Sequence, residues 1–209
     1  IEINPSNSQI GRGEPIRDTV RVLERYVDIL AIRTFEQEIL YEYKKWSNIP
    51  IINALSDLEH PCQILADFMT IKEEFGTFDD LTISYIGDPN NVSNSLILCA
   101  AILNIKINIG CPKQFMPSKE ILNRASKLSL KDEIVNVFND PRDAVRFSNV
   151  VYTDVWASMG QESKAVDKER FFKNYIVDTN LVNLAASNHI VMHCLPAYRG
   201  KEISDETFE

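Results

Sequence analysis

The chain has 209 residues, of which 44% are hydrophobic and 25% are charged, a composition typical of one large or two small folded domains and not of a disordered segment. Thirty acidic residues against 22 basic ones give a net charge of −8, and no block of Lys or Arg occurs, so we expect no nucleic-acid partner. No run of about 18 apolar residues is present, which argues against a membrane-spanning helix.

The cysteines and the chain ends give two further expectations. Cys62, Cys99, Cys111 and Cys194 match neither the spacing of a zinc site nor a disulfide framework. We therefore expect a reducing compartment, with the cytoplasm as first choice and the mitochondrial matrix as the alternative. The chain starts with Ile1 rather than Met and stops within a helical pattern, which we interpret as a fragment of a longer protein.

The first part of the chain alternates strand-like and helix-like segments. After a strand remnant at 1–3 and a polar loop, Pro15 begins a helix in which Ile16, Val20 and Leu23 recur at helical spacing. The elements that follow are a strand at 27–32, a helix at 35–46, a strand at 50–53 and a long helix at 60–75.

The same alternation continues to the end of the chain. The expected strands are 81–86, 105–108, 134–138, 149–155 and 189–193, and the expected helices are 92–103, 118–128, one near 141 and stretches within 167–187. Such alternation predicts an α/β fold. We expect two doubly wound parallel-sheet domains joined by the long helix, with the first domain incomplete. The GTFDD segment is the candidate boundary, which gives domains at 1–78 and 79–209.

Polar residues collect in the loops that follow the predicted strands, where open parallel sheets bind their ligands. LTISYIGDPNN contains one glycine after its strand, so the G-x-G-x-x-G loop of dinucleotide-binding proteins is absent. The P-loop and G-x-S-x-G motifs are absent as well. What remains is a set of positive groups, Arg33, His60 and Arg199, with the carboxylate of Asp154. This set suits an anionic substrate and an amine, and we expect no metal or cofactor.

Four separated segments closely resemble the transcarbamylase family. They are NALSDLEHPCQILADFMTIKEEFG (53–76), GDPNN (87–91), YTDVWASMG (152–160) and HCLPAYRG (193–200), and segment 8–28 is similar to the first domain of the family. The similarity covers essentially the whole chain. Two parts of the family pattern are missing, namely the Ser-Thr-Arg-Thr-Arg loop that binds phosphate and the C-terminal helices. We therefore expect the 209-residue chain alone to be inactive.

Within this family the HCLP segment and the SMG loop resemble the ornithine branch. The carboxylate of Asp154 would repel an aspartate substrate and attract an amine. The resemblance implies transfer of the carbamoyl group of carbamoyl phosphate to the δ-amine of L-ornithine, giving L-citrulline and phosphate, by a homotrimer. Two alternatives stay open: a transcarbamylase acting on putrescine or N-acylornithine, and a non-catalytic transcarbamylase-like binding protein.

The resemblance also assigns residues to carbamoyl phosphate, namely Gln9, Arg33, His60, Pro61, Cys62 and Gln63. Arg33 would contact the phosphate and carbonyl oxygens, because preorganised charge stabilises the negative charge that develops there. His60 would donate to the carbamoyl oxygen, and Gln63 would bind the carbamoyl amide. Position alone leaves other interpretations open: a surface salt bridge for Arg33, and helix capping for His60 and Gln63.

The residues assigned to ornithine by the resemblance are Asn91, Asp154, Ser158, Met159, Cys194 and Leu195. Asn91 would bind the α-carboxylate or α-amine, and Asp154 would pair with an ammonium group. Cys194 is placed beside the attacking nitrogen as a catalytic residue, together with Arg33 and His60, and the Leu195 carbonyl would orient the amine. The alternative for Cys194 is a small packing residue after a buried strand.

Overall fold

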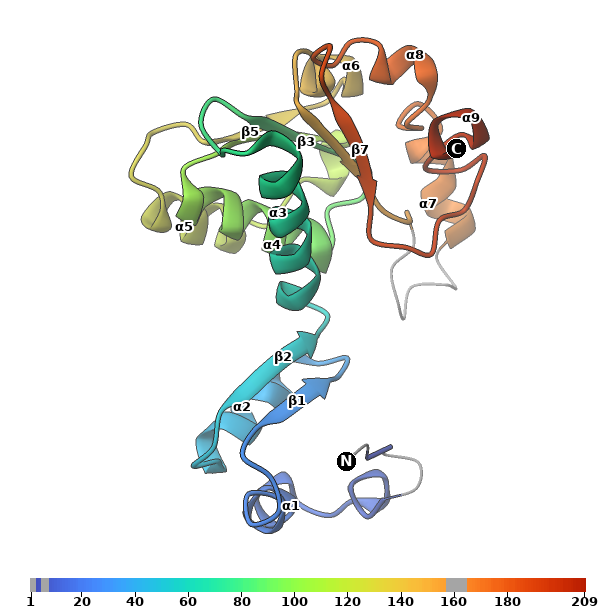
Figure 1. Ribbon diagram of the computed structural model, residues 1–209. Coiled ribbons are helices and arrows are strands. Elements are labelled where there is room, and N and C mark those ends of the chain that lie inside the picture. Colours follow the sequence, from blue (N-terminus) through green and yellow to red (C-terminus); the bar gives the residue numbers. More distant parts are fainter. Residues whose placement is uncertain (1–2, 5–7, 157–164) are drawn as a thin grey trace. The chain divides into compact units, whose positions relative to one another are not determined.

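The computed structural model describes residues 3–4, 8–156 and 165–209, and the chain divides into two compact units, residues 1–62 and 63–209. The first unit contains a short 3-10 helix, η2 (Ile10–Arg12), followed by α1 (Ile16–Leu23), β1 (Leu30–Arg33), α2 (Gln37–Trp46) and β2 (Ile51–Leu55). The strands β1 and β2 pair in parallel (Figure 1). This unit is therefore a β-α-β element with α1 in front of it.

The core of the first unit lies between its helices and its sheet. Val20 of α1, Leu40 and Tyr43 of α2, and Leu55 of β2 are all at most 6% exposed. In β1 the residues alternate between half-buried and exposed, so that Ala31 and Arg33 share the exposed face. One face of the strand thus faces the core, and its last residue, Arg33, is open to solvent.

The second unit is built on a wholly parallel sheet of β3 (Thr82–Ile86), β4 (Lys106–Gly110), β5 (Val135–Phe138), β6 (Val150–Thr153) and β7 (Ile190–His193). The strand order is β5-β4-β3-β6-β7. The central strands are buried almost throughout, as expected for a parallel sheet covered on both faces. The chain runs outward from β3 to β5 and then returns to the other side of β3. The order therefore reverses between β3 and β6.

The helices of the second unit cover this sheet. They are α3 (Pro61–Phe75), which begins at the unit boundary, α4 (Asn91–Leu103), η3 (Lys113–Phe115), α5 (Lys119–Leu128), α6 (Pro141–Val145), α7 (Ala165–Phe172), α8 (Thr179–Val182) and α9 (Asp205–Phe208). In Figure 1, α4 and α5 lie on one side of the sheet and α6 and α8 on the other. Ser118, Asp140, Asp178 and Ser204 each accept a bond from the first turn of the helix that they precede. Many of these helix starts are thus fixed by a short polar side chain.

The α/β class with parallel sheets is confirmed, and several strand boundaries differ from the expected ones. The first strand begins at Leu30 rather than at 27, because the turn that ends α1 extends over residues 24–26. The helical stretches expected within 167–187 correspond to α7 and α8, and Val177 between them pairs with Ile203. The compact units meet at Cys62 and Gln63, whereas the expected boundary at 78/79 stays a prediction.

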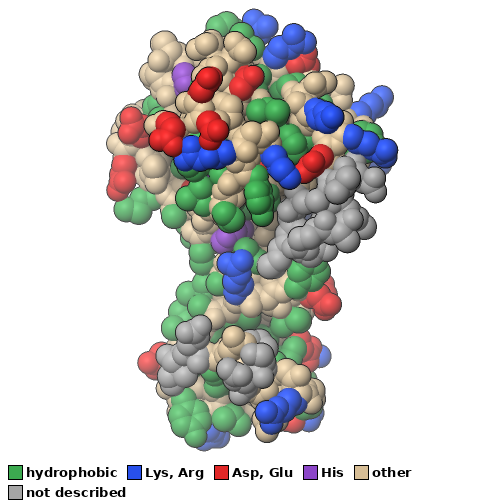
Figure 2. Space-filling model, turned by 90° about the vertical axis from the view of Figure 1, so that its right-hand side faces the viewer, with side chains coloured by type: hydrophobic (Ala, Val, Ile, Leu, Met, Phe, Trp, Pro, Cys, Tyr) green, Lys and Arg blue, Asp and Glu red, His purple; other side chains and the backbone are tan. Residues whose placement is uncertain are grey.

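Two surface properties accompany this fold. None of the helices in the described part of the chain is long and apolar enough to cross a bilayer. Figure 2 shows one face of the molecule, on which acidic and basic side chains of the described residues are interspersed.

Candidate active site

The reversal of strand order in the second unit brings two loops together at the carboxyl ends of β3 and β6. In open α/β sheets this reversal point is where ligands bind. The loop after β3 begins with Gly87, whose φ of 134° suits a glycine, and it continues to Asn90 at the start of α4. The loop after β6 begins with Asp154, which is 5% exposed. The sheet thus places a buried carboxylate where a ligand is expected.

Within the part of the chain that the structure describes, three donors bind the Asp154 carboxylate. Its Oδ1 accepts from the Cys194 thiol at 3.0 Å and from the Val155 N–H at 2.7 Å. Its Oδ2 accepts from Asn90 Nδ2 at 2.5 Å. Cys194 lies beside Asp154 because Thr153 and His193, the residues before them, are partners in the parallel pair of β6 and β7. Asp154 and Cys194, both assigned to ornithine by the resemblance, are therefore in direct contact.

Asn90 is a residue of this cluster that the sequence reasoning missed. Its Oδ1 accepts from the N–H groups of Val92 and Ser93, which caps α4. Its Nδ2 is thereby left to donate to Asp154. Asn91, which the resemblance assigns to ornithine, is the first residue of α4 and is half-buried, and its role stays a prediction. The only signal available in the sequence was the pair of adjacent asparagines, which does not show which one caps the helix.

The Cys194 thiol is a hydrogen-bond donor in this site. Burial, together with the neighbouring Asp154 carboxylate, raises the pKa of Cys194 far above its usual value. The group is therefore a thiol rather than a thiolate at neutral pH. Because its proton points to Asp154, the thiol orients the carboxylate and is a poor proton acceptor.

A buried ion pair fixes the loop after β3 to α7. Lys168 Nζ lies 2.6 Å from Asp88 Oδ2, and their side chains are 15% and 6% exposed. Burial raises the pKa of Asp88, and the bond from Lys168 opposes that rise. Tyr85 donates its hydroxyl proton to the Asp88 carbonyl at 2.8 Å. Sequence reasoning missed both members of the pair, which are 80 positions apart.

In the first unit, the segments that follow β1 and β2 are joined by backbone bonds. The Thr34 N–H donates to the Leu55 carbonyl at 3.0 Å, and the Asp57 N–H donates to the Phe35 carbonyl at 2.6 Å. Arg33 and the turn that leads to His60 therefore lie at the same edge of the two-stranded sheet. Arg33 is exposed at that edge, and His60 is half-buried immediately before α3.

The turn before His60 is closed by a serine that the sequence reasoning did not single out. Ser56 is fully buried, and its Oγ accepts from the Glu59 N–H at 3.1 Å. The Ser56 N–H donates to the Glu59 carbonyl at 2.8 Å. Cys62, near the start of α3, donates its thiol to the Asn53 carbonyl at 3.3 Å. These bonds fix the point at which α3 begins.

Gln63 is oriented by a buried acid one turn further along α3. Its Nε2 donates to Asp67 Oδ1 at 3.0 Å, and Tyr152 donates its hydroxyl to Asp67 Oδ2 at 2.8 Å. Burial raises the pKa of Asp67, while these two donors lower it. The Oε1 of Gln63 takes no part in these two bonds and can accept from a donor.

Four of the predicted site residues are either exposed or outside the described part of the chain. Gln9 precedes the 3-10 helix η2 and is exposed, and Leu195 follows Cys194 with 59% of its surface exposed. Ser158 and Met159 lie outside the described residues. Their assignment, like the roles of the other predicted residues, stays a prediction.

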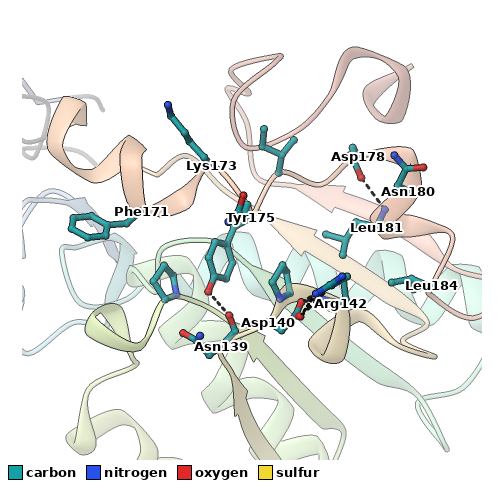
Figure 3. A pocket seen from close by; sticks show the side chains of 14 residues that line it. Asn139, Asp140, Arg142, Phe171, Lys173, Tyr175, Asp178, Asn180, Leu181 and Leu184 are labelled. Carbon is teal, nitrogen blue, oxygen red and sulfur yellow. Dashed lines mark hydrogen bonds and ion pairs between the residues drawn. The ribbon is translucent and has the colours of Figure 1, made fainter.

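A cavity of about 800 Å³ lies beside the outer strands of the second unit (Figure 3). Its lining residues come from the ends of β4 and β5 and from α6 to α8, and among the described residues none of the predicted site residues lines it. Its polar groups contact one another: Arg142 pairs with Asp140 at 2.6 Å, and Tyr175 donates to the Asn139 carbonyl. We assign no ligand to this cavity.

The side chains of Asp154, His193 and Cys194 offer ligand atoms that lie within 4.8 Å of one another, a spacing compatible with a metal ion. The same atoms are used in bonds inside the protein. Cys194 donates to Asp154, and His193 bonds to Leu195 and Glu202. The three side chains therefore belong to a hydrogen-bonded cluster, in which these atoms already have partners.

Two family models match the chain. The carbamoyl-P binding domain of aspartate/ornithine carbamoyltransferase matches residues 1–73, and the Asp/Orn binding domain of the same family matches residues 79–209. The ornithine carbamoyltransferase of Prochlorococcus marinus (strain MIT 9312) is 54% identical over all 209 residues, which cover 68% of the relative. That of Trichormus variabilis is 48% identical with the same coverage.

Solved structures agree with these matches. The ornithine carbamoyltransferase of Pyrococcus furiosus has a TM-score of 0.94 and 38% identity, covering 100% of this chain and 67% of that one. The anabolic ornithine carbamoyltransferase of Campylobacter jejuni has a TM-score of 0.91 and 39% identity, covering 97% and 68%. The chain thus spans about two thirds of the length of its relatives. It belongs to the aspartate/ornithine carbamoyltransferase family, among the ornithine carbamoyltransferases.

Proposed function

We propose that this protein transfers the carbamoyl group of carbamoyl phosphate to the δ-amine of L-ornithine, giving L-citrulline and phosphate. The observation that carries the proposal is the Asp154 carboxylate, which is buried at the strand-order reversal and bound by Asn90 and Cys194. A buried carboxylate at a ligand position favours a cationic substrate. Ornithine carries such a cation at the end of its side chain, and aspartate does not.

The chemistry requires the amine to be bound and then deprotonated. An alkyl amine has a pKa of about 10 and is almost fully protonated at neutral pH. We propose that Asp154 binds the ammonium form of the side chain. Loss of one proton from the ammonium group to solvent then frees the nitrogen lone pair for attack on the carbamoyl carbon, and the C–O bond to phosphate breaks as phosphate leaves. Asn91, Ser158, Met159 and the Leu195 carbonyl are proposed to hold the rest of the ornithine molecule.

Carbamoyl phosphate is assigned to the residues around β1 and the start of α3. Arg33 is proposed to contact its phosphate and carbonyl oxygens, and its fixed charge suits the negative charge that develops on both. His60, at the N-terminus of α3, is proposed to donate to the carbamoyl oxygen as a neutral imidazole, because the helix dipole disfavours a cation there. Gln63 is proposed to accept from the carbamoyl amide through Oε1, with Gln9, Pro61 and Cys62 as further contacts.

The experiment that tests the function incubates the full-length protein with carbamoyl phosphate and one amine at a time: ornithine, putrescine, acetylornithine or aspartate. The ureido product and the released phosphate are measured. We expect product with ornithine. Product with putrescine or acetylornithine instead would favour the alternative transcarbamylases, and failure with every amine would leave only the non-catalytic binding protein.

Cys194→Ser in the full-length protein is expected to lower kcat/KM for ornithine by more than tenfold, which corresponds to ~1.4 kcal/mol. The serine hydroxyl is still a donor, but its shorter bond to Cβ carries the donor away from Asp154 Oδ1. Steady-state kinetics with ornithine as the varied substrate checks this. Kinetics equal to those of the unaltered protein would assign Cys194 to packing.

Three further properties are proposed on the basis of family membership. We infer that both sheets belong to doubly wound parallel-sheet domains. We infer a homotrimer located in the cytoplasm. Sedimentation of the full-length protein as a monomer at micromolar concentration would contradict the trimer.

A further inference from the structure

Glu202 is a buried carboxylate outside the set of residues assigned so far. Its side chain is 1% exposed. One of its oxygens, Oε1, accepts from the Tyr198 N–H at 2.6 Å and from His193 Nε2 at 3.2 Å. Burying a carboxylate is costly unless donors satisfy it, and an apolar side chain of similar size would fill the space with less penalty. The two donors lie on either side of the loop that contains Cys194 and Leu195.

The bonds of His193 define its protonation state. The Leu195 N–H donates to His193 Nδ1 at 2.8 Å, so this nitrogen must carry a lone pair. The ring proton is therefore on Nε2, where it is donated to Glu202. His193 is a neutral imidazole whose two nitrogens connect the Leu195 backbone to the Glu202 carboxylate.

The loop needs such support because of its backbone. Leu195 has a φ of 59°, in the left-handed region that non-glycine residues rarely adopt. Residues in such a conformation persist when the surrounding structure holds them there. The bond to His193 fixes the Leu195 N–H, and the bond from Tyr198 to Glu202 fixes the far end of the loop.

Glu202 is itself anchored by the backbone of a neighbouring segment. Its carbonyl accepts from the Val177 N–H at 2.8 Å, and the Ser204 N–H donates to the Val177 carbonyl at 3.1 Å. The carboxylate thus has a fixed position relative to the core, in which Val177 is fully buried.

We propose that Glu202 is a positioning residue for the amine substrate, acting through neutral His193 to fix the backbone of Cys194 and Leu195 beside Asp154. This inference rests on the proposed function. It adds a residue that touches neither reagent but sets the geometry of the carbonyl and thiol that do. Its effect is expected on the amine side of the reaction, because within the described residues the carboxylate of Glu202 bonds to His193 and Tyr198, on either side of the loop that follows β7.

The test compares Glu202→Leu, Glu202→Gln and the control Glu206→Gln, which alters an exposed glutamate on α9, in the full-length protein. We expect Glu202→Leu to lower kcat/KM for ornithine by about thirtyfold while the KM for carbamoyl phosphate stays within about twofold. Glu202→Gln is expected to stay within about threefold of the unaltered protein, because its amide oxygen can accept both N–H groups from the position of Oε1.

The possible outcomes distinguish failure of the positioning role of Glu202 from failure of the proposed carbamoyl transfer. If the unaltered protein makes citrulline and Glu202→Leu has the same ornithine kinetics, the positioning role is wrong and the proposed function stands. Equal losses in the Leu and Gln variants, or an equal change in KM for both substrates, would also overturn it. If the unaltered protein makes no citrulline, both proposals fail.

A second variant keeps the test decisive if Glu202→Leu does not fold. In His193→Gln the amide nitrogen takes the place of Nε2 as the donor to Glu202. The amide oxygen is one bond further from the backbone than Nδ1, so it does not occupy the position that accepts from the Leu195 N–H. We expect the same ornithine-specific loss in kcat/KM, with the melting temperature measured in parallel. Ornithine kinetics equal to those of the unaltered protein in a folded His193→Gln variant would overturn the proposal.

Discussion

Asp154→Asn is expected to lower kcat/KM for ornithine by about a thousandfold, or ~4 kcal/mol, and to leave the KM for carbamoyl phosphate close to that of the unaltered protein. The substitution removes the negative charge that binds the ammonium group of the substrate, while the volume of the side chain hardly changes. Buried charge pairs with ligands lose several kcal/mol when one partner is removed. Steady-state kinetics with each substrate varied in turn measures both quantities.

The hydrogen bonds of Asp154 add to this expected loss. Among the described residues, the groups that hydrogen-bond to it are all donors: the Asn90 amide, the Cys194 thiol and the Val155 N–H. An asparagine would turn its own NH₂ group toward at least one of them, leaving two donors face to face in a buried site.

The matched control for this prediction is Asp143→Asn, which removes the same charge from an exposed position in α6. We expect the control to have the kinetics of the unaltered protein. If Asp154→Asn retained more than about a tenth of the original kcat/KM, a loss of under ~1.4 kcal/mol, Asp154 would not be the group that binds the amine.

The fold of the second unit could be predicted because its strands are buried on both faces and appear as continuous apolar runs. The segment LTISYI, for example, became β3 with five residues and little exposure. Prediction failed where a boundary depends on local geometry. Val27 and Ile29 look like strand residues, yet they follow the turn that ends α1, and hydrogen bonding with β2 begins only at Leu30.

The candidate site could be predicted only in part, because sequence patterns report which loops meet and not which atoms do. The loops of Asp154 and Cys194 follow strands of one parallel sheet, so their proximity follows from the fold. The contact of Asn90 with Asp154 depends on which of the two adjacent asparagines caps α4. The buried Glu202 depends on a chain reversal after Pro196 that no periodicity indicates.

The second large effect concerns the buried ion pair between Lys168 and Asp88. Lys168→Met is expected to lower the free energy of unfolding by ~3 kcal/mol at neutral pH, because it leaves a buried carboxylate without its cation. Chemical denaturation of the full-length protein measures the change. The control is Lys201→Met, whose partner Glu169 and own side chain are 38% and 51% exposed. An exposed pair of this kind contributes at most about 1 kcal/mol.

The pH dependence of the stability loss in Lys168→Met shows whether the loss comes from the unpaired Asp88 carboxylate or from lost packing of the lysine side chain. Burial raises the pKa of Asp88, and the bond and charge of Lys168 oppose that rise. Without the lysine, the pKa of Asp88 in the folded state is therefore expected to rise further. A carboxyl group whose folded pKa exceeds its unfolded value of about 3.9 favours folding at low pH, and this contribution is lost as the pH rises through the folded pKa. The deficit of Lys168→Met should therefore be complete at neutral pH and shrink as the solution is acidified. Adding Asp88→Asn should remove that dependence, whereas a deficit that is the same at every pH would mean that Lys168 contributes through its methylene packing alone.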